Sequence, residues 1–270
     1  IQMLIIALAV GSGVGVNSLI ARMLGARKQE MADKAASTSI RIGLFNYLIF
    51  LVIGLFVTVP FVGSYAERGS ETFTVPPHEK VEVDYEYPLV YSGFIHLQVQ
   101  IEKVLQSTGN MVAPMACSLT GAIINIVLDP ILIFGLLGFP RMEVAGAALA
   151  TVCGQFVAAG VALFLNLKHT PEIRLSLREI CFNRQIAADI YRIGIPSVIM
   201  QAIGSVMTFC MNRILISFTE AATAVFGAYF KLQSFIFMPV FGLNNGIIPI
   251  TAYNFGAARM DRVKRATKLG

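Results

Sequence analysis

The sequence predicts an all-α membrane protein that crosses the bilayer several times and contains an internal repeat. Of its 270 residues, 56% are hydrophobic and only 14% are charged, and the mean hydropathy is +0.69. Water-soluble domains carry about 25% charged residues. Since the apolar runs are long enough for helices that satisfy their own backbone hydrogen bonds in lipid, we expect membrane-spanning helices.

Seven segments are long and apolar enough to cross a bilayer core of about 30 Å, which takes about 20 residues. They are residues 2–21, 40–62, 89–107, 112–138, 144–166, 193–218 and 223–254. Polar residues interrupt the third segment: His96, Gln98, Gln100, Glu102 and Lys103. The seventh segment is too long for one straight helix, and Pro239 and Pro249 predict a bend in it.

The charges between the segments predict the orientation. Lys and Arg are concentrated in the first connection, in the fifth connection and after residue 258, whereas residues 63–88 of the second connection are acidic. Because cytoplasmic loops carry an excess of Lys and Arg, the basic connections are expected in the cytoplasm. This arrangement places Ile1 on the outer side and predicts that a further helix precedes it.

One stretch occurs twice. Residues 11–39 recur without a gap as residues 242–270, with six identities in 29 positions. The identical pairs are Gly11/Gly242, Gly15/Gly246, Ala21/Ala252, Gly25/Gly256, Ala26/Ala257 and Ala35/Ala266. A repeated Gly-rich helix is typical of transporters that consist of two related lobes. Gly25 and Gly256 are expected to end their helices, because glycine tolerates the left-handed backbone found there.

The repeat predicts a complete protein of two six-helix lobes, of which this chain is a fragment. Residues 1–167 are expected to form the first lobe without its first helix. Residues 168–192 are expected to form a cytoplasmic linker. Residues 193–270 are then the start of the second lobe, with its first two helices.

Asn125 and Asp129 are the strongest candidates for a functional site. They lie four residues apart in an otherwise apolar run, so they share one face of the fourth segment. A carboxylate inside the membrane costs several kcal/mol unless it is protonated, paired or bound to a cation. Pro130 also frees a backbone carbonyl oxygen nearby. The pattern favours a proton or Na⁺ site; the alternative is structural, with Asn125 bonding neighbouring helices and Asp129 bonding exposed amides.

Five stretches resemble the multidrug and toxic compound extrusion (MATE) transporters of prokaryotes: GVGVNSLIARMLGA, LQSTGN, NIVLDPILIFG, GAALATVCGQ and IPITAYNFGA. The resemblance implies a monomer in the plasma membrane that exports small organic, often cationic compounds in exchange for Na⁺ or H⁺. In some prokaryotic members, a first-lobe cation site uses an Asn and an Asp at this spacing and a Thr on the next helix. These correspond to Asn125, Asp129 and Thr151.

Four polar residues of the last two segments are candidates for a substrate cavity: Gln201, Lys231, Gln233 and Asn244. Gln201 has the equal alternative of a bond across a helix interface. Lys231 fits poorly with a strictly cationic substrate. The sequence contains no Ser/His/Asp or phosphate-loop pattern, so we expect neither an enzyme nor a cofactor, and the basic loops explain the net charge of +5 without nucleic acid.

Residues 64–88 depart from the family pattern, because Pro76, Pro77 and Pro88 are expected to prevent a continuous helix. This leaves residues 89–107 for the third segment. Two functional alternatives remain: a flippase for lipid-linked oligosaccharides or other lipids, with a related fold, and a membrane protein that transports nothing. A flippase is expected to line its cavity with several cationic residues for a pyrophosphate group.

Overall fold

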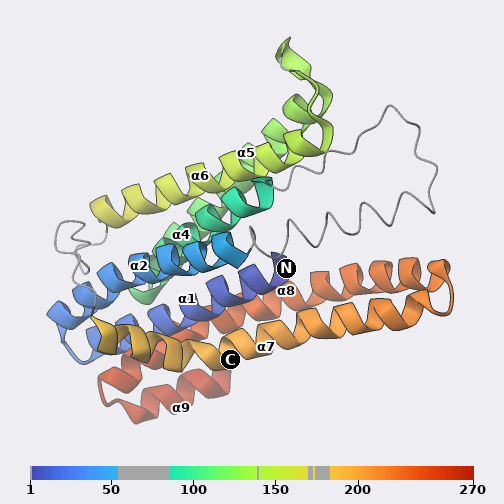
Figure 1. Ribbon diagram of the computed structural model, residues 1–270. Helices are drawn as coiled ribbons and strands as arrows, with labels where there is room; N and C mark the ends of the chain where they lie inside the picture. Colours follow the sequence, from blue (N-terminus) through green and yellow to red (C-terminus); the bar gives the residue numbers. More distant parts are fainter. Residues whose placement is uncertain (1, 54–85, 139, 170–172, 174–182) are drawn as a thin grey trace.

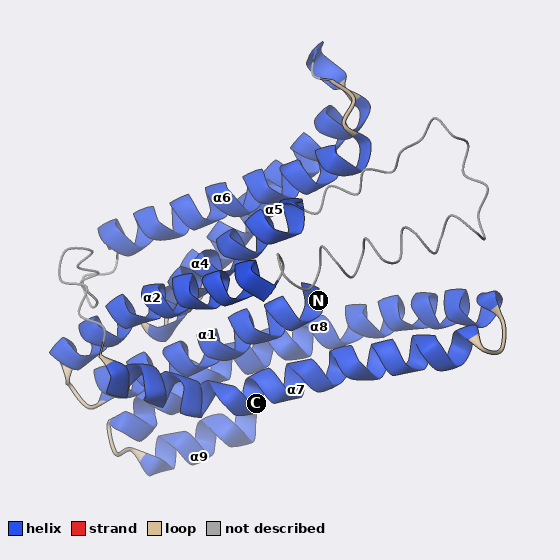
Figure 2. Cartoon of the chain, viewed as in Figure 1, coloured by secondary structure: helices blue, strands red, loops and turns tan. Residues whose placement is uncertain are grey.

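The computed structural model describes all residues except 1, 54–85, 139, 170–172 and 174–182, and the described residues contain helices and no strand (Figures 1 and 2). The helices are α1 (Gln2–Gly25), α2 (Gln29–Ile53), α4 (Glu86–Ser107), α5 (Val112–Phe134), the short 3-10 helix η2 (Leu136–Gly138), α6 (Glu143–His169), α7 (Arg184–Ile216), α8 (Glu220–Gly256) and α9 (Met260–Leu269). Within the described residues, each of the seven predicted segments therefore overlaps a long helix. This confirms the all-α fold class.

Helix α1 lies at the centre of the molecule (Figure 1). It packs against α2 and α4 on one side and against α7 and α8 on the other. Helices α5 and α6 pack along each other, and α6 packs against α4. At the right of Figure 1, the α5–α6 pair lies far from the α7–α8 pair. The assignment of these groups to two lobes stays a prediction.

The packing of helix α4 explains why the third predicted segment contains polar residues. Among the described residues, six helices are long and apolar enough to cross a membrane, and α4 is not one of them. It packs against α1, α2, α5 and α6, and its polar side chains His96, Gln98, Gln100 and Lys103 are buried there. Polar residues are tolerated in this helix because it faces protein instead of lipid.

Several predicted boundaries were wrong. Helix α2 begins at Gln29 and not at residue 40, and α5 ends at Phe134 and not at residue 138. Helix α4 begins at Glu86, so Pro88 lies inside its first turn, where the missing N–H has no helical partner to lose. Residues 64–85 of the atypical stretch lie outside the described residues. Helix α7 begins at Arg184 and not at residue 193, because the Asn183 side chain accepts hydrogen bonds from the next turn and Ile186 and Ile190 are buried. Helix α8 continues as one helix past its two internal prolines.

The turns after α1 and α8 repeat each other. Arg27 and Ala258, which are equivalent in the repeat, have left-handed backbone with φ of 58° and 56°. In both copies the next amide, that of Lys28 or Arg259, donates to the carbonyl oxygen five residues earlier at 2.9 Å. Helices α2 and α9 then begin at equivalent positions. The internal repeat seen in the sequence is therefore also a repeat of structure.

Gly25 and Gly256 end α1 and α8 as predicted, but they do not supply the left-handed residue. They are required where the two helices cross. A Cβ atom on Gly25 would overlap the carbonyl oxygen of Tyr253, and one on Gly256 would overlap that of Arg22. Since Arg22 and Tyr253 are also equivalent in the repeat, the two copies contact each other symmetrically through positions that only glycine can occupy.

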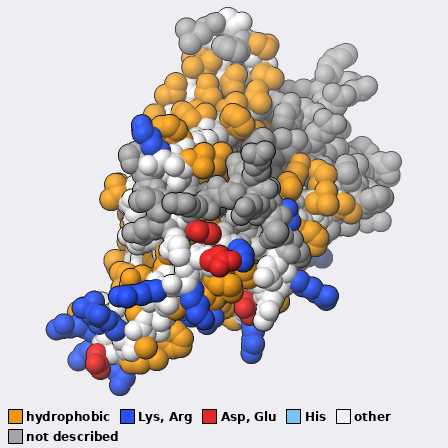
Figure 3. Space-filling model, turned by 90° about the vertical axis from the view of Figure 1, so that its left-hand side faces the viewer, with side chains coloured by type: hydrophobic (Ala, Val, Ile, Leu, Met, Phe, Trp, Pro, Cys, Tyr) orange, Lys and Arg blue, Asp and Glu red, His pale blue; other side chains and the backbone are white. Residues whose placement is uncertain are grey.

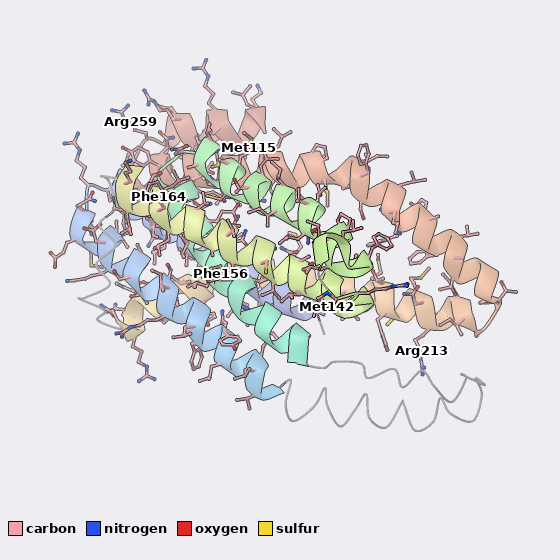
Figure 4. All side chains as sticks on the ribbon, turned by 90° about the horizontal axis from the view of Figure 1, so that it is seen from above. Met115, Met142, Phe156, Phe164, Arg213 and Arg259 are labelled. Carbon is pink, nitrogen blue, oxygen red and sulfur yellow. The ribbon has the colours of Figure 1, made fainter. Side chains whose placement is uncertain are left out.

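Basic side chains gather at the end of the molecule where α1 and α8 terminate. Figure 3 looks onto this end, and Lys and Arg cover much of the lower part of the face. Arg259 lies at this end in Figure 4, and Arg213 lies near the opposite end. The distribution agrees with the predicted cytoplasmic side.

Candidate cation site

The three residues predicted to hold a cation lie together between α5 and α6. The Asn125 Nδ2 donates to Asp129 Oδ1 at 3.4 Å on the same helix and to Thr151 Oγ1 at 3.2 Å on α6. The Thr151 hydroxyl donates to the carbonyl oxygen of Ala147 at 2.8 Å. All three side chains are half-buried. The amide of Asn125 thus connects the carboxylate to the neighbouring helix.

Small residues bring the two helices close enough for this contact. A Cβ atom on Gly154 of α6 would lie 2.8 Å from the carbonyl oxygen of Gly121, and one on Gly121 of α5 would lie 3.0 Å from that of Gly154. Ala158 also faces Gly121. Because Asn125 follows Gly121 by one turn and Thr151 precedes Gly154 by almost one turn, the close approach places their side chains opposite each other.

The local backbone fixes where α5 begins and ends. The Asn110 side chain accepts hydrogen bonds from the amides of Val112 at 3.1 Å and Ala113 at 3.2 Å, and Gly135 at the other end has a φ of 71°. Pro130 lies inside the helix and has no N–H, so the carbonyl oxygen of Ile126 has no helical donor. This oxygen is one turn from Asp129.

The oxygen atoms available here suit a hard cation. Asp129 uses one carboxylate oxygen for Asn125, and the amide of Asn125 presents its oxygen to the site when it rotates by half a turn. Carboxylate, amide, hydroxyl and backbone oxygens are the ligands that hard cations take, and the same carboxylate accepts a proton. The ligand atoms gathered here are therefore of the kinds that bind Na⁺ or H⁺.

A cavity of about 310 Å³ extends from this site between α4, α5 and α6. Its lining residues are Gln98, Ser118, Gly121, Ala122, Asn125, Thr151, Gly154, Gln155 and Ala158. At its far end, Ser118 Oγ donates to Glu102 Oε1 at 3.1 Å. Gln98, Glu102, Ser118 and Gln155 were not predicted as site residues. The polar residues that interrupt the third segment were the available signal.

The predicted substrate-cavity residues do not join this site. Gln201 lies exposed on α7, and on α8 Lys231 and Asn244 are exposed and Gln233 is half-buried. None of them lines the cavity between α4, α5 and α6. Their role in binding substrate stays a prediction.

A second polar cluster connects the helices around α1. The Ser12 hydroxyl accepts from Gln100 Nε2 at 2.9 Å and from Asn46 Nδ2 at 3.4 Å, and the Tyr191 hydroxyl donates to Asn46 Oδ1 at 2.6 Å. These four residues come from α1, α4, α2 and α7.

A buried lysine adds a link to α8. Lys103 Nζ donates to Asn245 Oδ1 at 3.1 Å and to Gln106 Oε1 at 2.9 Å, although only 6% of the Lys103 side chain is exposed. The predicted cavity residue Asn244 is thus the neighbour of the residue that makes this contact. The third segment therefore contacts the second copy of the repeat.

Hydrophobic side chains cover the outside of α5 and α6. Met115, Phe156 and Phe164 project from these helices in Figure 4, and each is more than half exposed. Exposed side chains of this kind are expected on a surface in contact with lipid.

Comparisons with known proteins agree with this architecture. The family model described as MatE matches residues 1–131 and 196–270. Multidrug export protein MepA of Staphylococcus aureus (strain NCTC 8325 / PS 47) is 30% identical over 260 residues, which is 95% of this chain and 54% of the relative. MepA of Staphylococcus saprophyticus is 29% identical over 253 residues, which is 93% of this chain and 54% of the relative.

A solved structure is also similar. It shows a multidrug resistance MATE family transporter in an outward-facing conformation, with a TM-score of 0.75, 29% sequence identity and coverage of 98% of this chain and 57% of that chain. This chain spans about half the length of the curated relatives it matches. These relatives are transport proteins and not enzymes, which agrees with the prediction from the sequence. The chain belongs to the MatE family of multidrug export transporters and is a multi-pass membrane protein.

Proposed function

We propose that the protein of which this chain is part is a secondary antiporter in the plasma membrane of a prokaryotic cell. It exports small organic, often cationic compounds in exchange for Na⁺ or H⁺. The observation that carries the proposal is the contact of Asp129 with Asn125, and of Asn125 with Thr151, inside the membrane-spanning part of α5 and α6. The names of the relatives support the substrate class.

The geometry suggests how the cation acts. Asp129 is negatively charged when it holds neither a proton nor Na⁺, and an unpaired charge is unfavourable inside the membrane. A cation at Asp129 competes with the Asn125 amide nitrogen for the Asp129 and Thr151 oxygen atoms to which that nitrogen now donates. Binding therefore changes the contact between α5 and α6. If the substrate changes the affinity for the cation, the cation changes the affinity for the substrate by the same factor.

The test is efflux of ethidium from cells that express the gene encoding this sequence, with Na⁺ and pH gradients imposed separately. We expect efflux to follow one of the two gradients. Asp129→Asn keeps the shape of the side chain but removes the charge, and should lower gradient-driven efflux at least about tenfold, which corresponds to about 1.4 kcal/mol. The control is Asp261→Asn on the exposed surface of α9, which should export at the wild-type rate.

Other outcomes favour the alternatives. If neither gradient drives efflux and Asp129→Asn changes nothing, the carboxylate is structural and the flippase hypothesis becomes the stronger one. Transfer of a labelled pyrophosphate lipid between leaflets of reconstituted vesicles would then identify that activity. A protein with neither activity would support the hypothesis that it transports nothing.

A further inference from the structure

Glu102 contacts Ser118 at one end of the cavity, and Asp129 contacts Asn125 at the other end. The Glu102 carboxylate accepts a hydrogen bond from Ser118, which lines the cavity, and Asn125 lines the same cavity further along α5. Ser118 and Asp129 are about three turns apart, or about 16 Å along the axis of α5. Because α5 starts at Val112 on the predicted cytoplasmic side, Glu102 marks the cytoplasmic end and Asp129 the outer end.

Gln98 points to a ligand in this cavity. It is one turn from Glu102 on α4 and lines the cavity, and only 7% of it is exposed. Its Oε1 is buried and has no hydrogen-bond partner among the described residues. A buried amide oxygen without a partner costs about 1–3 kcal/mol. A cation, or water that accompanies it, would satisfy this atom, and the volume of the cavity is large enough for both.

The charged groups around Glu102 leave its carboxylate available to bind a cation. Glu102 makes no ion pair with any described residue. Lys103 is next to it in the sequence, but its ammonium donates to Gln106 and Asn245. Cys117 on α5 is the other titratable group near it. The Ser118 hydroxyl is thus the described group that contacts the carboxylate.

We propose that Glu102, Gln98 and Ser118 form a second subsite for the coupling cation, at the cytoplasmic end of the cavity. The ligand is a monovalent cation, Na⁺ or H⁺, held by the carboxylate of Glu102 with the amide oxygen of Gln98 and the hydroxyl of Ser118 beside it. This inference rests on the proposed antiport function. It adds that the cavity between α4, α5 and α6 holds two cations, one at each end.

The experiment counts the cations bound by the purified protein. Equilibrium binding of ²²Na⁺ tests Na⁺, and protons released when ethidium is added to a weakly buffered Na⁺-free solution test H⁺. Whichever of these two measurements detects binding, we expect it to give about two cations per protein for the wild type. Glu102→Gln and Asp129→Asn should each give about one. The double variant should give none. Glu30→Gln changes an exposed glutamate and should behave as the wild type.

The results separate this inference from the proposed function. A wild type that binds one cation, lost in Asp129→Asn but kept in Glu102→Gln, would leave the antiporter intact and overturn the second subsite. A wild type without a signal in either arm would overturn both. If Glu102→Gln does not fold, Ser118→Ala serves instead: it should change the affinity for one of the two cations about threefold to tenfold. Na⁺ should bind more weakly because it loses a ligand, whereas H⁺ should bind more tightly because the Ser118 hydroxyl no longer stabilises the charged carboxylate. Unchanged affinities in Ser118→Ala would then refute the subsite.

Discussion

Replacing Gly154 by alanine should separate α5 from α6 and disconnect the candidate cation site. The new Cβ atom would lie 2.8 Å from the carbonyl oxygen of Gly121, where ordinary contacts start at 3.4 Å. The helices must therefore move apart by about 0.6 Å to remove the overlap. The overlapping atom is a backbone oxygen, so no flexible side chain can absorb the change.

The movement is large enough to break the contact between the helices. The bond from Asn125 to Thr151 measures 3.2 Å. If the shift reaches it in full, the distance becomes about 3.8 Å, which is too long for a hydrogen bond. Overpacking costs about 1–3 kcal/mol and the lost bond about 1 kcal/mol. We expect Gly154→Ala to destabilise the protein by about 2–4 kcal/mol.

The assay is unfolding of the purified protein in detergent, together with the cation dependence of ethidium efflux. Gly160→Ala is the matched control, because it lies on the same helix and its Cβ would meet no atom within 4 Å. Alanine there should stabilise the helix by about 0.5–1 kcal/mol. Equal stability of the two variants, with unchanged cation dependence, would show that close packing at Gly154 does not hold the site together.

Two further predictions concern the contacts around α4 and α1. Asn245→Val removes a partner of the buried Lys103 ammonium and should lower the free energy of unfolding by about 1.5–3 kcal/mol. The double variant with Lys103→Met should regain most of that lost stability. If the costs of the two substitutions simply add in the double-mutant cycle, the contact is contradicted. Tyr191→Phe removes the bond to Asn46 and should cost about 1 kcal/mol, whereas Tyr229→Phe on the exposed side of α8 should cost almost nothing. A cost of the same size for both tyrosines would argue against a role for the Asn46 bond.

Most of the fold could be predicted because it depends on properties that are local in the sequence. The length of an apolar run predicts a spanning helix without reference to the rest of the protein. The start of α7 shows the limit of predicting helices from apolar length. Asn183 caps this helix outside the apolar run, so the length of that run did not reveal the first turns of the helix. Gly25 shows a second limit, because its close contact with Tyr253 depends on how two distant helices cross.

The candidate site was also predictable only where its residues are related by local sequence spacing. Asn125 and Asp129 could be paired because helical periodicity places residues four apart on one face. Thr151 came from a family resemblance, and it does lie beside Asn125. Gln98 and Glu102 were visible only as polar residues in an apolar segment. Their place at the cavity depends on which face of α4 meets α5, and a helix with polar residues on several faces does not reveal this.

Those several faces of α4 have different partners. Gln98 and Glu102 are one turn apart; Gln98 lines the cavity beside α5 and α6, and Glu102 contacts Ser118, which also lines it. Gln100 and Lys103 lie on another face and contact Ser12 of α1 and Asn245 of α8. A helix packed on all sides moves as a unit, since close-packed interiors transmit displacement. The helix that borders the proposed cation subsites is therefore also the helix that contacts the second copy of the repeat, and α4 is the direct physical connection between them.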